Sequence, residues 1–384
     1  MKKMKLVSML LTLVMVVSMF AACGQAADNG SDSTDDNTAA TEDAGGSDAA
    51  PAGDTAGVDP LEITFTTTFN ETETGGLILK KFEEVLAEES GGAITVNFLW
   101  GGTAYDTMAE LDAVADGSAD MCALGHMPHI DVLNYLAFPG FAPGSPENAT
   151  AYFEYLMFEN EETSALIQGE AEALGIKYLN IVAGGANAFC TTYEFTDLDS
   201  MIAGSKSFGN MDAAIFEYLG FQVSAVGPGD TFTALDNGQI DSTQMGLAPM
   251  VSMGWYEVAK YWALDGTYTA GNPFTVNLAW WNGLTAAQQE CIQTAADAAA
   301  EFSAESYTKD IEGDVQTVEE ATGNAFVVLS DADIDRFWEA CFEAKAASAI
   351  ATAKENGKDE GMVTILKAAA EFTDYDWEVP AEYQ

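Results

Sequence analysis

Histidine, a residue often used for acid–base chemistry and metal binding, occurs only at His126 and His129. The two lie close together in a loop that contains Pro128, so their imidazoles could share a metal ion. No acidic residue or thiol stands near them at a spacing typical of metal ligands. We therefore predict no metal site, and we interpret His126 as a loop side chain that contacts a ligand or water.

Cysteine thiols indicate no zinc site either. Cys122, Cys190, Cys291 and Cys341 follow Cys23, and none of them belongs to a CxxC pair. Buried free thiols are the favoured interpretation of the four later cysteines. Disulfide bonds remain the alternative, since pairing cannot be read from a sequence.

The sequence signatures of common enzymes are missing. The chain has no GxSxG, no HExxH and no phosphate-binding loop, and two histidines are too few for most acid–base schemes. We predict a protein that is not an enzyme and that needs no cofactor. A surface hydrolase with a pair of carboxylates remains the alternative, because 61 residues are Asp or Glu.

Charge limits the possible partners. The 61 acidic residues face only 14 Lys and Arg, which gives a formal net charge of −47. Such a field repels nucleic acid and anionic lipid surfaces, so we predict no nucleic-acid partner. The only arginine is Arg336.

The first 60 residues indicate export. Residues 1–22 combine lysines, a short apolar run and small residues, as secretory signals do, and Cys23 then matches the bacterial lipoprotein pattern. Residues 23–60 are acidic and almost free of large apolar side chains, which predicts a disordered tether. We predict an extracytoplasmic protein, at the cell surface or in the periplasm, anchored to the cell membrane through lipid on Cys23. An uncleaved membrane helix is the alternative, although the apolar run is short for a full span.

The elements that position the functional side chains begin at Leu61. Strand-like and helix-like patterns alternate from there on, which predicts an α/β protein, and its length favours two lobes. We place the first lobe at residues 61–185 and the second at 186–270. Residues 271–384 return to the first lobe and add a long helix and C-terminal helices. A last strand is expected at Val327–Ser330.

Three predicted strands of the first lobe are followed closely by Asn70, Trp100 and His126. If these strands are parallel, their ends meet at one edge of the sheet, where ligands bind in wound α/β folds. In the second lobe, residues 196–245 alternate strand, helix, strand, helix and strand, with a helix start at Asp197–Leu198. This is a small wound lobe without a cofactor fingerprint.

Several motifs, in this order, resemble the solute receptors of TRAP (tripartite ATP-independent periplasmic) transporters. They are Gly91–Val96, Gly117–Met121, Asp197–Leu198, Leu235–Asp241, Tyr256–Tyr261 and Trp280–Asn282. The resemblance extends from about Leu61 to Phe342. It implies a two-lobed fold of the periplasmic-binding-protein type, with a hinge and a long helix that spans both lobes.

The resemblance places the first crossover between the lobes at Ala183–Gly185, and Gly266 and Gly271 flank Tyr268 at the return crossover. The spanning helix matches residues 284–321, where Thr285 and Gln288 form a capping box. Two helices broken near Gly313 are the alternative. The implied function is a receptor that binds a small polar metabolite between its lobes and delivers it to the permease subunits of a TRAP transporter. A receptor for another transporter or for a sensor is the alternative.

The chain departs from the family at its ligand-binding arginines. TRAP receptors commonly hold a ligand carboxylate with an arginine, and the two matching positions here carry Phe208 and Asn187. An alignment shifted by two residues would place Lys206 in the site instead. If the alignment holds, the solute is uncharged, zwitterionic or cyclic and polar rather than a simple organic acid. The candidate ligand-binding residues are Asn70, Trp100, His126, Asn187, Phe208, Asn210, Thr243 and Gln244.

Overall fold

The computed structural model describes residues 57–136, 141–211, 213–269 and 271–384. The predicted signal sequence, the lipidation site at Cys23 and almost all of the predicted tether lie outside these residues. Within them, no helix is long and apolar enough to cross a membrane.

The first of two sheets has five strands in the order β2, β1, β3, β11, β5. Their bounds are Ile94–Leu99, Leu61–Thr66, Met121–Ala123, Pro273–Asn277 and Ile176–Ile181. Strand β1 pairs in parallel with both β2 and β3, whereas β11 runs antiparallel to its neighbours β3 and β5. Ile63 and Phe65 are fully buried, whereas Glu62 before them is exposed and Thr64 between them is half-buried, which is the alternation expected of a strand with one face on a core.

Helices cover this sheet through apolar residues at helical spacing. Helix α1 (Thr74–Glu89) buries Ile78, Phe82 and Leu86, and these contact α10 (Ala286–Thr322) in one hydrophobic cluster. Helix α2 (Glu110–Ala115) packs beside β3 and β11, and α9 (Leu278–Gly283) follows β11 directly.

The second sheet has six strands in the order β4, β10, β6, β9, β7, β8. Their bounds are Phe141–Pro143, Tyr261–Thr269, Ala186–Thr191, Ser242–Gly246, Phe208–Gly209 and Val223–Ser224. Four short helices connect or flank them: α5 (Leu198–Gly204), α6 (Ala213–Leu219), α7 (Pro228–Asp236) and α8 (Leu247–Ser252). The predicted helix start is confirmed, because Asp197 and Ser200 form a capping box at α5.

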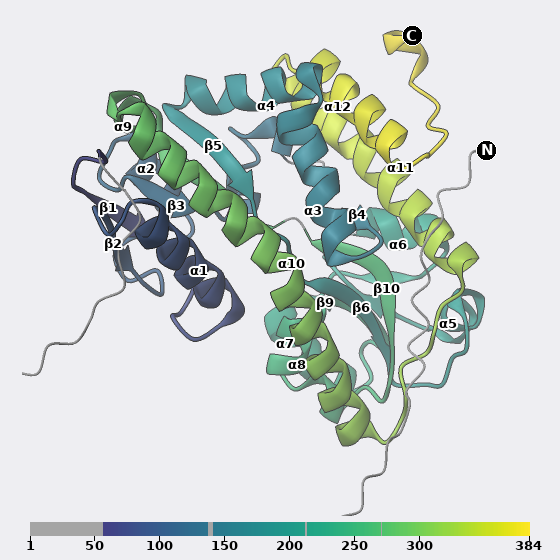
Figure 1. The fold of residues 1–384 in the computed structure, drawn as a ribbon. Helices are drawn as coiled ribbons and strands as arrows, with labels where there is room; N and C mark the ends of the chain where they lie inside the picture. Colours follow the sequence, from purple (N-terminus) through teal and green to yellow (C-terminus); the bar gives the residue numbers. More distant parts are fainter. Residues whose placement is uncertain (1–56, 137–140, 212, 270) are drawn as a thin grey trace, which may run out of the picture. The chain divides into compact units, whose positions relative to one another are not determined.

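Helix α10 is continuous over 37 residues and runs alongside both sheets (Figure 1). The capping box of Thr285 and Gln288 starts it, and Gly323 ends it with a left-handed φ of 73°. It passes through Gly313 without a break, so the alternative of two separate helices is wrong. Alanines such as Ala296 and Ala299 are buried on it, which lets its backbone lie close to its neighbours.

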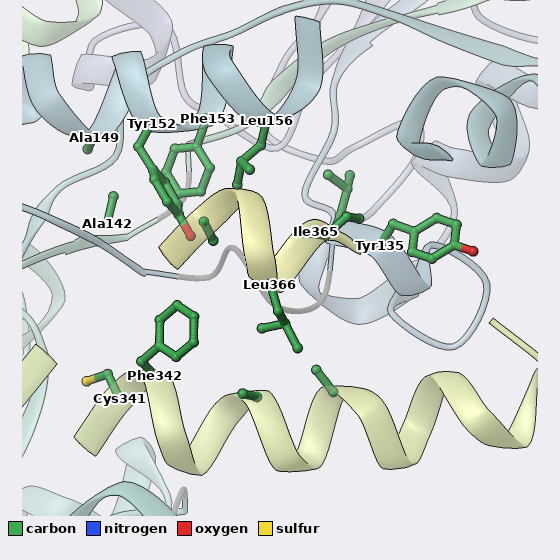
Figure 2. Close-up of a cluster of buried hydrophobic side chains, with 14 of the residues drawn as sticks. Tyr135, Ala142, Ala149, Tyr152, Phe153, Leu156, Cys341, Phe342, Ile365 and Leu366 are labelled. Carbon is green, nitrogen blue, oxygen red and sulfur yellow. The ribbon is translucent and has the colours of Figure 1, made fainter. Parts of the chain in front are cut away.

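The C-terminal helices share a core with helices from the middle of the chain. Figure 2 shows Phe342 of α11 (Asp331–Glu355) directed toward Tyr152 of α3 (Pro146–Glu154), and Leu366 of α12 (Asp359–Phe372) directed toward α11. A π-helical turn and α4 (Glu161–Ala173) continue this layer. The expected strand at Val327–Ser330 is absent from the structure: only Val327 N donates to the second sheet, at Trp262 O, and Val328 is 89% exposed.

Two crossovers connect the sheets. The chain leaves β5 after Ile181 and enters β6 at Ala186, and it returns between Thr269 and Pro273. The crossovers touch each other: Val182 N donates to Asn272 O at 3.3 Å, and Thr269 N donates to Gly185 O at 3.0 Å. A Cβ atom on Gly271 would collide with the carbonyl of Val182, so this approach requires glycine.

Candidate functional site

A pocket of about 260 Å³ lies on the second sheet. Four residues predicted from the sequence line it together: Asn187, Asn210, Thr243 and Gln244. They come from β6, from β9 and from the residue that follows β7, three strand segments that neighbour one another in the sheet. Strand pairing therefore brings together side chains that are far apart in the sequence.

The floor of the pocket is a buried hydrogen-bond network centred on Asp265 of β10. The Asp265 side chain is fully buried, and its Oδ2 accepts a 2.7 Å bond from Gln244 Nε2. Its Oδ1 accepts from the backbone N–H and from the hydroxyl of Thr267, each at 2.8 Å. Asn187 Nδ2 then donates to Thr267 Oγ1 at 3.0 Å. One carboxylate thus connects to two of the three pocket amides, to Gln244 directly and to Asn187 through Thr267.

A bulge in β10 makes this network possible. The register between β10 and β6 shifts between Leu264 and Tyr268, and Gly266 in between has φ of 78°. Such an irregularity re-aims side chains next to it. Gly266 was expected at the return crossover, but it lies inside β10, where a Cβ atom would lie 2.6 Å from the side chain of Ile334.

Burial raises the pKa of Asp265 to about 6, even though its hydrogen bonds from Gln244 and Thr267 lower it. The carboxyl group is therefore mostly ionised at neutral pH. No Lys, Arg or His is among the residues that line the pocket. A buried negative charge thus lies beneath a pocket without a basic side chain.

Apolar and hydroxyl side chains complete the pocket. The lining residues not predicted from the sequence are Gly209, Met211, Ile215, Phe216, Val226, Pro228, Thr231, Met245, Gly246, Trp255, Thr269 and Phe337. The hydroxyls of Thr231, Thr243 and Thr269 each donate to a backbone carbonyl, at 2.9, 2.6 and 3.2 Å. The indole N–H of Trp255 is buried in the wall and has no partner among the described residues.

At the first of the two arginine positions, neither alignment places its residue in the pocket, whereas Asn187 at the second position lines it. Phe208 is fully buried behind the wall, where its ring stacks on Phe216 with centroids 4.3 Å apart. An aromatic ring so enclosed has no face toward the pocket, so the structure does not support direct contact with a solute. Lys206 is exposed and absent from the lining, and its backbone N–H donates to Asp241.

The family can now be assigned. Residues 65–350 match the model of bacterial extracellular solute-binding protein family 7. The chain belongs to this family. The match confirms the predicted TRAP-receptor resemblance, and it makes the protein an extracytoplasmic solute-binding protein rather than an enzyme.

Solved structures confirm the predicted two-lobed α/β fold of this solute-binding protein. A TRAP periplasmic solute-binding protein from Rhodobacter sphaeroides, in an apo open form, has a TM-score of 0.69 and 16% identity, over 81% of this chain and 99% of that chain. One from Ochrobactrum anthropi has a TM-score of 0.66 and 19% identity, over 83% and 99%. One from Desulfovibrio salexigens with bound orotic acid has a TM-score of 0.60 and 18% identity, over 81% of this chain and 99% of that chain.

Among curated proteins, this solute-binding protein is similar to the uncharacterised protein y4mM of Sinorhizobium fredii. They are 26% identical over 200 residues, which cover 51% of this chain. The aligned part is only 36% of y4mM, so the chain spans about a third of that relative.

Three residues of the solute-binding protein predicted for its first lobe lie outside the pocket. Asn70, Trp100 and His126 follow strands β1, β2 and β3, whose parallel pairing directs these ends to one edge. Asn70 is exposed, and Trp100 stacks on Phe98 with ring centroids 4.6 Å apart. His126 is only 4% exposed, and its Nδ1 has no partner in the described part of the chain.

The surroundings of His126 contain further buried polar atoms. Burial and the neighbouring His129 lower the pKa of His126 to about 4. Glu110, which no sequence pattern indicated, is fully buried; its Oε1 accepts from Gly125 N at 2.6 Å, and Oε2 has no partner among the described residues. Burial raises its pKa to about 7. No group of three or more His, Cys, Asp or Glu side chains suited to a metal occurs in the described ranges.

A larger concavity, of about 980 Å³, lies between α3, β5 and α10. Its charged lining consists of Lys177 and six carboxylates: Glu147, Glu154, Glu159, Asp297, Glu301 and Glu305. Five of these carboxylates are exposed, Glu154 being the exception. Side chains solvated in this way form a charged outer face, whereas solute pockets are mostly apolar with a few convergent polar groups. We therefore assign the solute site to the smaller pocket.

Proposed function

We propose that this solute-binding protein is the extracytoplasmic receptor of a TRAP-type secondary transporter. It binds a small polar solute in the pocket on the second sheet and hands it to membrane permease subunits. The observation that carries the proposal is the convergence of Asn187, Asn210, Thr243 and Gln244 on one pocket in a chain of a solute-binding family. Relatives of the same fold carry orotic acid, β-D-galacturonate or malonate.

Closure of the two lobes completes the site in this proposal. The pocket residues come from the second sheet and from the helices and loops around it, with none from the first sheet, so closure of the lobes would cover a solute bound there. Asn70, Trp100 and His126 lie at the ends of three adjacent strands of the other sheet, where wound sheets bind ligands. Hinge bending at the two crossovers would bring them to the solute, as in other two-lobed receptors. Phe208 supports the wall behind Phe216 in this arrangement.

A lipid on Cys23 keeps the receptor at the membrane in this proposal. The sequence that precedes Cys23 and the acidic stretch that follows it support an anchor with a long tether. Metabolic labelling with a palmitate analogue tests the anchor: the wild-type protein takes up label and partitions with membranes, whereas Cys23→Ser is unlabelled. Labelling of the Cys23→Ser variant would contradict this assignment.

A thermal-shift screen of residues 61–384 against a metabolite library tests the receptor function. A solute that binds only the folded state raises the melting temperature. At a concentration 1,000 times Kd, it adds about 4 kcal/mol to the free energy of unfolding. Calorimetry then measures Kd for each positive solute in the wild type and in Trp100→Ala. We expect the substitution to weaken binding at least tenfold if the lobes close on the solute. Unchanged affinity would overturn lobe closure but not binding to the second sheet.

A further inference from the structure

The orientation of the Gln244 amide follows from Asp265. An ionised carboxylate can only accept hydrogen bonds, so Gln244 must direct its Nε2 toward Asp265 Oδ2. The planar amide then places Gln244 Oε1 on the side away from that nitrogen. In the described residues this oxygen accepts no hydrogen bond, and the side chain lines the pocket.

The orientation of Asn187 is determined one step further along the network. Thr267 has a single hydroxyl hydrogen, which it gives to Asp265 Oδ1. Its oxygen can therefore only accept from Asn187, which must direct Nδ2 toward Thr267. Asn187 Oδ1 is left without a hydrogen-bond donor within the described chain, and the side chain lines the same pocket. Both amides thus offer carbonyl oxygens to a solute.

Other groups in the wall reinforce this polarity. The hydroxyls of the three lining threonines, Thr231, Thr243 and Thr269, donate their hydrogens to backbone carbonyls, so their oxygens can only accept a hydrogen bond from a solute. Asn210 Nδ2 donates to the backbone carbonyl of Gln244 at 2.9 Å. The indole N–H of Trp255, which has no partner among the described residues, has its nitrogen buried within the wall.

We propose that the pocket binds its solute through a protonated amine, held by Asn187 Oδ1 and Gln244 Oε1, which the Asp265 network turns toward it. This inference rests on the proposed receptor function and names the class of solute. An ammonium group brings hydrogens to both carbonyl oxygens and a positive charge above buried Asp265. The rings of Phe216 and Phe337 in the lining favour a cation as well. A carboxylate in the same place meets lone pairs and a like charge.

Matched triads of small molecules test the amine requirement on the full chain. Each triad contains an amino acid, its decarboxylated amine and its deaminated acid: leucine, isopentylamine and 4-methylpentanoate, or phenylalanine, phenethylamine and 3-phenylpropanoate. The same three classes are compared across the metabolite library by thermal shift and calorimetry. We expect binding by amines or amino acids, with each deaminated acid at least tenfold weaker.

The variant Asp265→Asn tests the cause of this preference. Asparagine still accepts from Thr267 through Oδ1 but offers Nδ2 to Gln244, whose amide then turns over and presents its N–H groups to the pocket. We expect amine affinity to fall at least tenfold and the acid of the triad to gain affinity. Asp120→Asn is the matched control, because Asp120 accepts from Thr64 N within the first sheet and loses the same charge away from the pocket. It should leave the ranking unchanged.

The possible results distinguish failure of the amine inference from failure of the proposed receptor function. Preference for acids or for uncharged solutes in the wild type overturns the amine inference and leaves the receptor function in place. An unaltered ranking in Asp265→Asn overturns the role of the network. If Asp265→Asn does not fold, Asn187→Ala replaces it, with a tenfold loss of amine binding expected and no gain for acids. A library without any binding solute contradicts the receptor function itself.

Discussion

The carboxylate of Asp265 accepts a 2.7 Å hydrogen bond from the side-chain amide of Gln244. Asp265 is completely buried, whereas Gln244 lines a pocket. A buried carboxylate therefore determines which atoms of the Gln244 amide face the pocket. The stability of the second sheet and the chemistry of the site are therefore linked through the same bond.

Gln244→Ala should impair both stability and binding. The substitution leaves Asp265 Oδ2 buried without a donor, which costs about 1–3 kcal/mol. Asn187→Ala removes a donor from Thr267 only, so its loss of stability should be smaller. Urea unfolding of the ligand-free variants, followed by calorimetry with a bound solute, measures both effects. Equal stability of Gln244→Ala and the wild type would mean that the bond to Asp265 contributes nothing.

Gly266→Ala should destabilise the protein more than Gly238→Ala. Both glycines have a left-handed φ, of 78° and 74°, and an alanine there is strained by about 1–2 kcal/mol. A Cβ atom at Gly238 meets open space, whereas one at Gly266 would lie 2.6 Å from Ile334. Thermal unfolding of Gly238→Ala measures the cost of backbone strain alone, and that of Gly266→Ala measures the strain together with the clash. Ile334→Ala should partly rescue Gly266→Ala; the absence of rescue would exclude the clash as the cause.

Gly313→Ala should stabilise the protein by about 0.5–1 kcal/mol. Gly313 is an exposed residue inside α10, a Cβ atom there has no neighbour within 4 Å, and alanine favours a helix over glycine. Gly323 at the end of the same helix has φ of 73°, so Gly323→Ala should be destabilising. Denaturant midpoints measure the two changes. A loss of stability in Gly313→Ala would contradict a continuous helix.

Glu110→Gln should change how stability depends on pH. The carboxyl pKa is about 7 in the folded protein and has an ordinary value of 4.5, because burial, together with the charge of Asp106, favours the protonated form. The folded state therefore binds more protons between these pH values, so the unfolding free energy falls as pH rises from about 4.5 to about 7. The loss is on the order of 3 kcal/mol.

The variant lacks this titration, so the wild type should lose stability relative to Glu110→Gln over that interval. Urea unfolding at pH 4.5, 6 and 8 measures the free energy of unfolding of both proteins across the pH range in which Glu110 titrates. His126 titrates in both proteins, so its opposite effect cancels in the comparison. A constant difference across these pH values would show that Glu110 titrates normally.

Local sequence patterns were sufficient for much of the fold. The capping boxes at Asp197 and Thr285 act within one turn of helix, so residue types a few positions apart predict both helix starts. Asn187, Thr243 and Gln244 could be assigned to one cleft because the resemblance implied a two-lobed receptor with its site between the lobes. Val327–Ser330 failed as a strand because an apolar run alone cannot reveal whether a pairing edge is available.

The centre of the site could not be read from the sequence. Asp265 is one of 61 acidic residues, and only the bulge at Gly266 reveals that it points into the sheet. A glycine after an aspartate in a strand pattern is the one local signal of such a bulge. Phe208 was assigned by alignment with an arginine, but its environment is an aromatic cluster contributed by β6, α6 and α11, which no local pattern shows.

If the lobes close on the solute as proposed, the contact between the two crossovers controls affinity from outside the pocket. Gly184 and Gly271 permit a backbone-to-backbone approach that no larger residue would allow. A side chain at either position would push the crossing strands apart and shift the balance between open and closed lobes without touching the solute. The observed dissociation constant is the intrinsic one divided by the fraction of closable molecules. Under the proposed closure, substitutions at these two residues therefore change the sensitivity of the receptor while its pocket stays the same.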